Sequence, residues 1–232
     1  MGPTVQSVVM ELAAARRDLH ETLLRMVDDR LVVGSAGNAS VRIDERTLLV
    51  SAGGRLYRHL SPDDHPLVDL ATGEVRAGAA PTSELALHLA VMRALPDVHA
   101  VVHTHSPYAA GWSVARLDLD FVCNENIGPA GERILVTQPY APPGTTDLAD
   151  ATVATLLRQP GSRACLLANH GPLTVGPTLE VAYTVAQQVE WVAQMSFVAR
   201  SLGHVHVIAP EQQDQIGRTY GFRVARPPHH SA

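Results

Sequence analysis

The sequence has little of what defines several large protein classes. It has two cysteines, Cys123 and Cys165, far apart and without a Cys-x-x-Cys pair, so we expect free thiols and a cytoplasmic protein. Charged residues make up 18% of the chain and the net charge is -5, which gives no electrostatic reason to expect nucleic acid or an anionic membrane as a partner. No apolar run reaches the roughly 18–20 residues of a membrane-spanning helix. Charged residues also interrupt residues 1–18, where a signal peptide would be apolar.

Several well-known enzyme motifs are also missing. No Gly-x-Gly-x-x-Gly follows a candidate strand and no P-loop occurs, which argues against a Rossmann domain and against a P-loop nucleotide hydrolase. His-Glu-x-x-His and Gly-x-Ser-x-Gly are absent as well. The sequence therefore argues against a metalloprotease with a His-Glu-x-x-His helix and against a serine hydrolase with a Gly-x-Ser-x-Gly turn.

What the chain does have is enough apolar sequence for a sizeable core. With 232 residues, 46% of them hydrophobic, we predict one α/β domain over residues 1–232. Apolar spacing predicts helices at residues 5–31, 83–94, 145–157 and 179–202, and strands at 39–43, 47–51, 67–69, 98–105 and 163–168. Such an order indicates an α/β/α layered domain with a mixed or antiparallel sheet.

The most informative residues are His103 and His105, in an apolar segment that we predict to be a strand. Side chains two positions apart on a strand point to the same face, so both imidazoles would face one point. Imidazole is the commonest protein ligand for zinc and similar metals. The pair therefore indicates a metal site, although such a pair also occurs without one.

Two further segments offer ligands. His170 lies where a predicted buried strand ends in a Gly-Pro turn, and Glu84 lies at the start of a predicted helix. Three imidazoles with one carboxylate or water fit a catalytic zinc site that keeps an exchangeable position. Glu84 alone can also be an acid favoured in a first helical turn. Spacing does not exclude other histidines as ligands, namely His20, His59, His65, His88, His99, His204 and His206.

A second group of residues suggests an anion site. Residues 34–40 are rich in glycine and small polar side chains, and Thr82 and Ser83 are expected to open a helix. The first amides of a helix are unpaired and favour an anion, so these segments together can hold a phosphate. The simpler alternative is a helix end followed by a turn, and an N-cap.

An ordered set of segments resembles the class II aldolase/adducin family, most closely its fuculose-phosphate aldolase branch. The set consists of Gly-Ser-Ala-Gly-Asn-Ala-Ser at 34–40, Pro-Thr-Ser-Glu at 81–84, Ala-Val-Val-His-Thr-His at 100–105, Pro-Tyr-Ala at 139–141, Gly-Thr at 144–145, Asn-His-Gly at 169–171 and Thr-Tyr-Gly at 219–221. The resemblance covers about residues 8–223. No single segment is decisive, but the ordered set is specific.

The resemblance implies a fold and a set of site residues. The implied fold is a three-layer α/β/α sandwich around a mostly antiparallel sheet, usually in homotetramers with sites near subunit interfaces. The implied Zn²⁺ ligands are His103, His105, His170 and Glu84, with Glu84 also acting as acid or base. The implied phosphate-binding residues are Ser35, Gly37, Asn38, Ser51, Gly54, Thr82 and Ser83.

The reaction implied by the resemblance is retro-aldol cleavage of a short ketose phosphate to dihydroxyacetone phosphate and an aldehyde. A divalent metal would act as a Lewis acid on the substrate oxygens while Glu84 moves protons. Tyr220 resembles a tail tyrosine that approaches the substrate, and alternatively it is a packing anchor. Imidazole ligands do not separate Zn²⁺ from Mn²⁺, Fe²⁺ or Co²⁺.

Two departures from the family pattern leave other reactions open. Gly53 stands where the family loop carries a hydroxyl group, and an ungapped alignment puts Glu125 where the fuculose enzyme has a catalytic tyrosine, which makes Glu125 a candidate proton donor. Residues 167–172 also resemble the branch that decarboxylates phosphorylated 3-oxo sugar acids. A third possibility is a non-catalytic interaction module, as in the adducin branch, although that branch lacks the full set of metal ligands.

Overall fold

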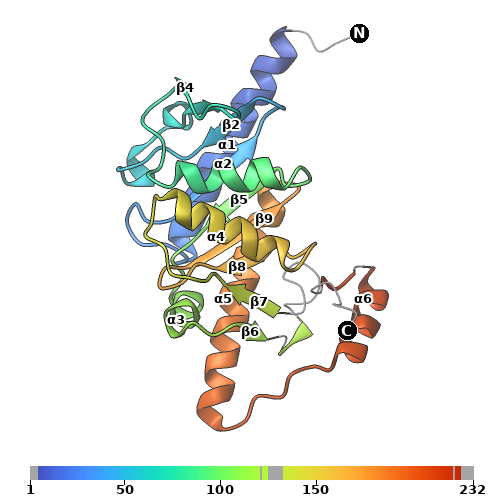
Figure 1. Ribbon diagram of the computed structural model, residues 1–232. Coiled ribbons are helices and arrows are strands. Elements are labelled where there is room, and N and C mark those ends of the chain that lie inside the picture. The colour runs from blue at the N-terminus through green and yellow to red at the C-terminus, as the bar shows by residue number, and fades with distance from the viewer. Residues whose placement is uncertain (1–4, 121, 125–132, 222, 226–232) are drawn as a thin grey trace.

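The fold is built around one mixed β-sheet (Figure 1). The computed structural model describes residues 5–120, 122–124, 133–221 and 223–225. Nine strands in this part of the chain lie in the order β4-β3-β2-β1-β5-β9-β8-β7-β6. They are β1 (Asn38–Arg42), β2 (Thr47–Val50), β3 (Leu67–Asp69), β4 (Val75–Ala77), β5 (Ala100–His103), β6 (Leu119–Asp120), β7 (Arg133–Val136), β8 (Ala164–Leu166) and β9 (Pro172–Gly176). Among these strands only β7 and β8 pair in parallel, so the sheet is mostly antiparallel, as predicted, but mixed.

Helices cover both faces of the sheet. The structure has α1 (Val5–Asp28), α2 (Leu85–Ala94), α3 (Pro107–Ala115), α4 (Thr146–Leu157), α5 (Leu179–Leu202) and α6 (Pro210–Tyr220), with short 3₁₀ helices at Tyr57–His59 and Pro62–Asp64. Core residues of α1 and α5 pack with one face, and those of α2 and α4 pack with the other. α3 joins the α5 side over β7 and β8. The predicted three-layer α/β/α sandwich is therefore confirmed.

The alternation of side chains in β5 shows why two apolar layers form. Ala100 and Val102 pack with α1 and α5, whereas Val101 packs with α2 and α4. All three are fully buried, because successive side chains of a strand point to opposite faces and each face has its own helices. β5 therefore lies at the centre of both layers, and the residues at its end have a rigid support.

Most predicted elements are present, with shifts at their ends. α5 has the predicted bounds, and α4 begins after Thr145, whose hydroxyl accepts a hydrogen bond from the amide of Leu148. The first helix ends at Asp28 rather than at residue 31, and α2 begins at Leu85 rather than at residue 83. The strands β4, β6, β7 and β9 and the helices α3 and α6 were not predicted from the apolar spacing.

The start of α3 is held by a carboxylate from α5. Glu190 accepts hydrogen bonds from the amides of Tyr108 at 3.0 Å and Ala109 at 2.9 Å. An anion at a helix N-terminus pairs amides that have no partner within the helix and interacts favourably with the helix dipole. Because α3 begins two residues after His105, this contact also limits where His105 can lie.

Two further findings concern the cysteines and the length of apolar helices. Cys165 is a free thiol and fully buried in the core. Among the described residues, no helix combines the length and the apolar character that crossing a bilayer requires.

His65 is a fully buried histidine whose two ring nitrogens both have partners. Its Nδ1 accepts a hydrogen bond from the amide of Ala52 at 3.2 Å, and its Nε2 lies 3.1 Å from Nδ1 of His20. Since the amide can only donate, the proton of the neutral ring lies on Nε2. Burial lowers the pKa of His65 from 6.5 to about 4, His20 and Arg16 act in the same direction, and Asp64 opposes them.

We predict that this histidine makes stability depend on pH. Between pH 6.5 and about 4 the unfolded chain binds a proton that folded His65 does not, so its contribution is full above pH 6.5 and is lost as the pH falls toward 4. The expected loss in the free energy of unfolding is about 2 kcal/mol between about pH 7 and pH 5. Urea titrations of metal-free protein measure it. His65→Asn keeps an acceptor for the Ala52 amide without titrating, so its pH dependence should be shallower, and identical slopes would contradict the assignment.

Candidate metal centre

Three imidazole rings converge at one end of the central strands β5, β8 and β9. His103 is the last residue of β5, His105 follows two residues later, and His170 lies in the turn between β8 and β9. The Nε2 atom of His105 lies 3.0 Å from Nε2 of both His103 and His170, and the latter two atoms are 3.3 Å apart. The sequence prediction that these three histidines meet is therefore matched by the geometry.

The reason that His105 joins His103 differs from the one expected. β5 ends at His103, so His105 does not share a strand face with it. The amide of His105 instead donates to the carbonyl oxygen of Leu31 at 3.0 Å, while the amide of Thr104 still bonds Pro172 on β9 at 3.1 Å. The chain thus leaves the sheet after Thr104, and a loop after α1 fixes the position of His105.

Glu84 supplies a carboxylate from the layer of helices. It is the N-cap residue of α2 and only 5% exposed. Its Oε2 lies 3.3 Å from Nε2 of His103, and its Oε1 lies 3.8 Å from Nε2 of His170. The ligand atoms of Glu84, His103, His105 and His170 all lie within 4.8 Å of one another. Among the described residues, this is the one group of three or more histidine, cysteine, aspartate and glutamate side chains arranged in this way.

The turn that carries His170 is packed directly on the strand end. A Cβ atom at Gly171 would lie 2.2 Å from the carbonyl oxygen of Thr104, far inside van der Waals contact. Only glycine lets the two backbones approach this closely. The identity of residue 171 therefore sets the distance between His170 and the other two imidazoles.

Burial favours the neutral form of all three imidazoles, and the tautomer of His103 follows from its backbone contact. Nδ1 of His103 lies 2.9 Å from the carbonyl oxygen of Pro172, which can only accept, so the proton lies on Nδ1 and Nε2 is free to bind a metal. Burial, then His170 and His105, keep the pKa of His103 well below 6.5. Burial also lowers the pKa of His105 and of His170, although Glu84 acts in the opposite direction.

These donors fit a divalent transition metal. Nitrogens bound tetrahedrally to zinc at their usual distance lie about 3.3 Å apart, close to the spacing observed here. Oε1 of Glu84 is buried and has no hydrogen-bond partner in the described part of the chain. An unpartnered buried carboxylate oxygen is costly, and a bound cation would remove that cost. The arrangement can therefore hold a metal with one displaceable carboxylate ligand.

Comparison with known proteins agrees with this geometry. The family model for the class II aldolase and adducin N-terminal domain matches residues 17–197. The chain belongs to the class II aldolase and adducin family. It is 32% identical to L-fuculose phosphate aldolase of Haemophilus influenzae over 219 residues, which cover 93% of this chain and 99% of the relative.

Two other members of the family are similar over most of their length. The chain is 30% identical to 5-deoxy-D-ribulose 1-phosphate aldolase of Bacillus thuringiensis serovar kurstaki over 202 residues, which cover 84% of this chain and 90% of the relative. A solved structure of L-fuculose 1-phosphate aldolase matches with a TM-score of 0.84 at 27% identity, over 90% of this chain and 97% of that one. Members of the family that carry the name aldolase are metal-dependent lyases.

The segments that the class II aldolase resemblance assigned to phosphate lie side by side. The amide of Thr82 donates to the carbonyl oxygen of Ser51 at 3.0 Å, and the amide of Ala39 lies 3.3 Å from Oγ of Ser51. A Cβ atom at Gly53 would lie 2.6 Å from the carbonyl oxygen of Pro81, so the missing hydroxyl at this position follows from close backbone packing. Of the assigned residues, Gly37, Asn38, Ser51 and Thr82 are buried, and Ser35, Gly54 and Ser83 are exposed.

One part of the anion-site prediction was wrong. The helix begins after Glu84, and the amides next to it are not free. The amide of Glu84 lies 3.3 Å from Oγ1 of Thr82, and the amide of Leu85 donates to the carbonyl oxygen of Thr82 at 3.2 Å. Thr82 therefore occupies two of the donors that were expected to face an anion.

Tyr220, the tail residue singled out in the sequence analysis, is not brought to the metal centre of its own chain. Tyr220 is the last residue of α6 and 71% exposed. Figure 1 draws α6 and α3 on opposite sides of β6 and β7, and α3 begins two residues after His105. Glu125 lies outside the described residues.

His88 and its contact with Asn38 were missed as part of the site. Nε2 of His88 lies 2.6 Å from Oδ1 of Asn38, whose Nδ2 donates to Oε2 of Glu84 at 2.8 Å. A signal was present in the sequence, because Glu84 and His88 are four residues apart at the start of a predicted helix and so share a face. Asn38 is also paired directly with His103 between β1 and β5.

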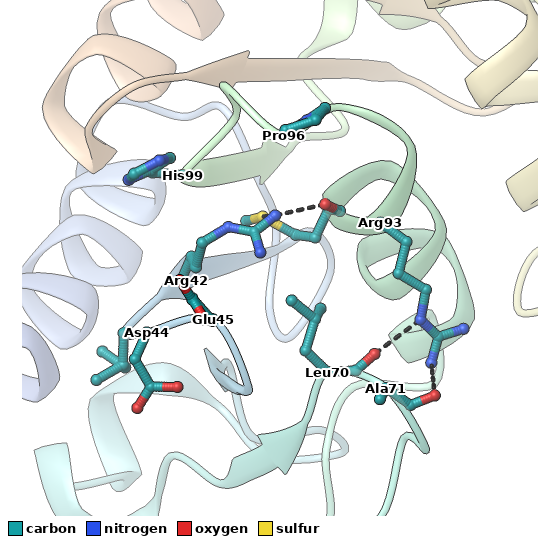
Figure 2. Close-up of a pocket in the computed structure, with 10 residues that line it drawn as sticks. Arg42, Asp44, Glu45, Leu70, Ala71, Arg93, Pro96 and His99 are labelled. Carbon is teal, nitrogen blue, oxygen red and sulfur yellow. Dashed lines mark hydrogen bonds between the residues drawn. The ribbon is translucent and has the colours of Figure 1, made fainter.

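A separate cavity lies at the other end of the strands (Figure 2). It measures about 750 Å³ and is lined by Arg42, which ends β1, and by His99, which precedes β5. Arg42 donates to the carbonyl oxygen of Met92, and Arg93 donates to the carbonyl oxygen of Leu70 at 2.7 Å. The two guanidinium groups thus hold neighbouring segments together. The four candidate ligands lie at the opposite ends of the strands.

We predict that Gly171→Ala weakens the metal centre specifically. The added methyl group must displace the turn from Thr104, which should cost about 1–3 kcal/mol of stability and at least about tenfold in metal affinity. Gly111→Ala is the matched control, because Gly111 is exposed on α3 and nothing lies within 4 Å of the place that its new methyl group would take. That control should gain about 0.5–1 kcal/mol and bind metal normally. Urea unfolding and chelator competition measure both effects, and unchanged metal affinity in Gly171→Ala would contradict this account.

Proposed function

We propose that the protein is a Zn²⁺-dependent aldolase that cleaves a short ketose phosphate to dihydroxyacetone phosphate and an aldehyde. The observation that carries the proposal is the convergence of three neutral imidazoles on a buried carboxylate with one unpartnered oxygen. The similarity to aldolases that act on L-fuculose phosphate and 5-deoxy-D-ribulose 1-phosphate supports the substrate class. Both names describe a ketose carrying a phosphate.

His103, His105, His170 and Glu84 would hold the metal. A divalent ion bound there supplies Lewis acidity, which stabilises negative charge that develops on substrate oxygens during cleavage of the carbon–carbon bond. The three imidazoles would be the fixed ligands, because contacts with the backbone hold His103 and His105 and close packing at Gly171 holds the turn of His170. The carboxylate is the ligand that the substrate would displace.

Glu84 is placed to transfer protons once displaced. Its Oε2 is held by the side-chain amide of Asn38, whereas Oε1 has no partner among the described residues. A carboxylate can act as general base or acid when a substrate proton comes within hydrogen-bond reach. We therefore assign to Oε1 both proton removal from the substrate hydroxyl and proton return to the cleaved product.

The phosphate end of the substrate would lie against the three adjacent segments described above. Asn38 has a second amide proton besides the one given to Glu84, and Ser51 and Thr82 add hydroxyl groups and backbone nearby. The exposed residues Ser35, Gly54 and Ser83 and the backbone of Gly37 would complete the rim. Tyr220 lies apart from the centre of its own chain, so we expect it to reach a substrate only from a neighbouring subunit of a homotetramer.

The test is metal quantification followed by a product screen. Protein purified without chelator should carry about one divalent ion per chain, and ketose 1-phosphates should yield dihydroxyacetone phosphate. Release of carbon dioxide from phosphorylated 3-oxo acids, without cleavage of any ketose phosphate, would show a decarboxylase instead. A chain that binds no metal and cleaves nothing would indicate an interaction module like that of the adducin branch.

We predict that His103→Ala abolishes bound metal and turnover together. The loss in metal affinity should exceed the roughly 10–100-fold that is typical when only a residue supporting a ligand is changed. His99→Ala is the control, since His99 is exposed and lies just before the other end of the same strand, beside the distant cavity. Elemental analysis and steady-state kinetics give both readouts. Normal metal content in His103→Ala would contradict the proposed function.

A further inference from the structure

A buried chain of hydrogen bonds lies behind Glu84. Asn38 Nδ2 lies 2.8 Å from Oε2 of Glu84, His88 Nε2 lies 2.6 Å from Oδ1 of Asn38, and His88 Nδ1 lies 2.7 Å from Oγ of Ser40. All four side chains are at most 5% exposed. The chain connects the helix layer to β1, because Glu84 and His88 belong to the start of α2 whereas Asn38 and Ser40 lie on β1.

The direction of every hydrogen bond in this series follows from the carboxylate of Glu84. A carboxylate can only accept, so Asn38 must turn its NH₂ group toward Glu84 and its Oδ1 toward His88. His88 must then donate from Nε2, which leaves Nδ1 to accept the hydroxyl proton of Ser40. Burial lowers the pKa of His88 to about 4, with Glu84 opposing and His103 reinforcing the shift, so the ring is neutral near pH 7. Neutrality and the required tautomer agree.

The orientation of the Asn38 side-chain amide matters because its carbonyl oxygen, if turned toward Glu84, would repel the carboxylate. Without a donor at Oδ1, the amide can rotate by half a turn and bring its oxygen toward Oε2 of Glu84. With the donor in place, Oε2 is occupied and Oε1 remains the unpartnered oxygen, 3.8 Å from Nε2 of His170. Both oxygens lie near the three histidines, Oε2 at 3.3 Å from Nε2 of His103, but only Oε2 has a hydrogen bond from Asn38. The imidazole of His88 therefore keeps Oε2 paired and Oε1 unpaired.

We propose that His88 is a positioning residue: its Nε2 proton fixes the amide of Asn38, and through it the carboxylate of Glu84, so that Oε1 stays unpaired and available to a metal. His88 itself contacts neither the three imidazoles nor the unpartnered oxygen in the described interactions. The role rests on the proposed function, since it concerns how the same centre holds and releases its carboxylate ligand. Outer residues that orient metal ligands commonly govern metal affinity.

The matched pair His88→Asn and His88→Gln tests the role. A glutamine amide reaches the position of Nε2 and can donate to Asn38, whereas an asparagine amide reaches only the position of Nδ1 and can bond Ser40. Each variant thus keeps one bond of the chain. The Zn²⁺ dissociation constant, measured by chelator competition, should rise about 10–100-fold for His88→Asn and stay close to that of the wild type for His88→Gln.

A purely structural role would give a different pattern. If His88 only fills the core, both variants should lose similar stability in urea and bind Zn²⁺ alike, and that result would overturn the proposal. Should His88→Asn fail to fold, nitrogen-15 NMR of the histidine rings in metal-free wild-type protein decides the matter. The proposal requires the Nε2–H form of His88 at neutral pH, and the Nδ1–H form or a protonated ring would refute it.

The outcomes separate this role from the proposed function. Wild-type protein that binds no Zn²⁺ contradicts the proposed function itself. Wild-type protein that binds Zn²⁺ normally, but shows the wrong His88 tautomer or equal losses in the two variants, contradicts only the positioning role.

Discussion

The structure depends on holding three imidazole nitrogens within 3.3 Å of one another inside the protein. Neutral imidazoles that point their lone pairs at a common centre gain nothing from that arrangement by themselves, so the surrounding fold must enforce it. Pairing of β5 with β9 fixes His103, the loop after α1 fixes His105, and the glycine beside His170 allows its turn to touch the strand end. Each constraint is a backbone contact, which is more rigid than a chain of side chains.

The carboxylate comes from a different layer, and its support differs accordingly. Glu84 sits at the start of a helix on one face of the sheet, and its contacts to β1 pass through side chains only. The imidazoles are therefore fixed, whereas the carboxylate is held by a hydrogen bond that can break. A centre with three rigid ligands and one releasable ligand suits chemistry in which a substrate must enter the coordination sphere.

Much of this arrangement could be predicted from the sequence because periodicity and ordered motifs carry it. The long helix 179–202 and the cap at Thr145 follow from local patterns, and the ligand set follows from the ordered family segments. Short elements such as β9 were missed, since five residues in the centre of a sheet are buried on both faces and show no alternation. We predicted His105 to lie on a strand because the sequence does not reveal where a strand stops pairing with its neighbour in the sheet.

The polar contacts were the least predictable part. The amides at the start of α2 were expected to be free, but Thr82 accepts hydrogen bonds from the amides of Glu84 and Leu85. The role proposed for His88 depends on which way the side-chain amide of Asn38 faces, and no spacing rule gives that orientation. Such contacts are set by tertiary packing, whereas apolar periodicity is a property of the chain alone.

The four candidate ligands are spread over residues 84–170, which has a thermodynamic consequence. An unfolded chain cannot gather donors from three such distant segments, so an ion that binds here binds the native state alone. Free ion at about 100 times its dissociation constant adds about 2.7 kcal/mol to the free energy of unfolding. That is a large part of the roughly 5–15 kcal/mol by which proteins are typically stable. Resistance of this protein to heat and to proteases would accordingly track the supply of trace metal in its surroundings.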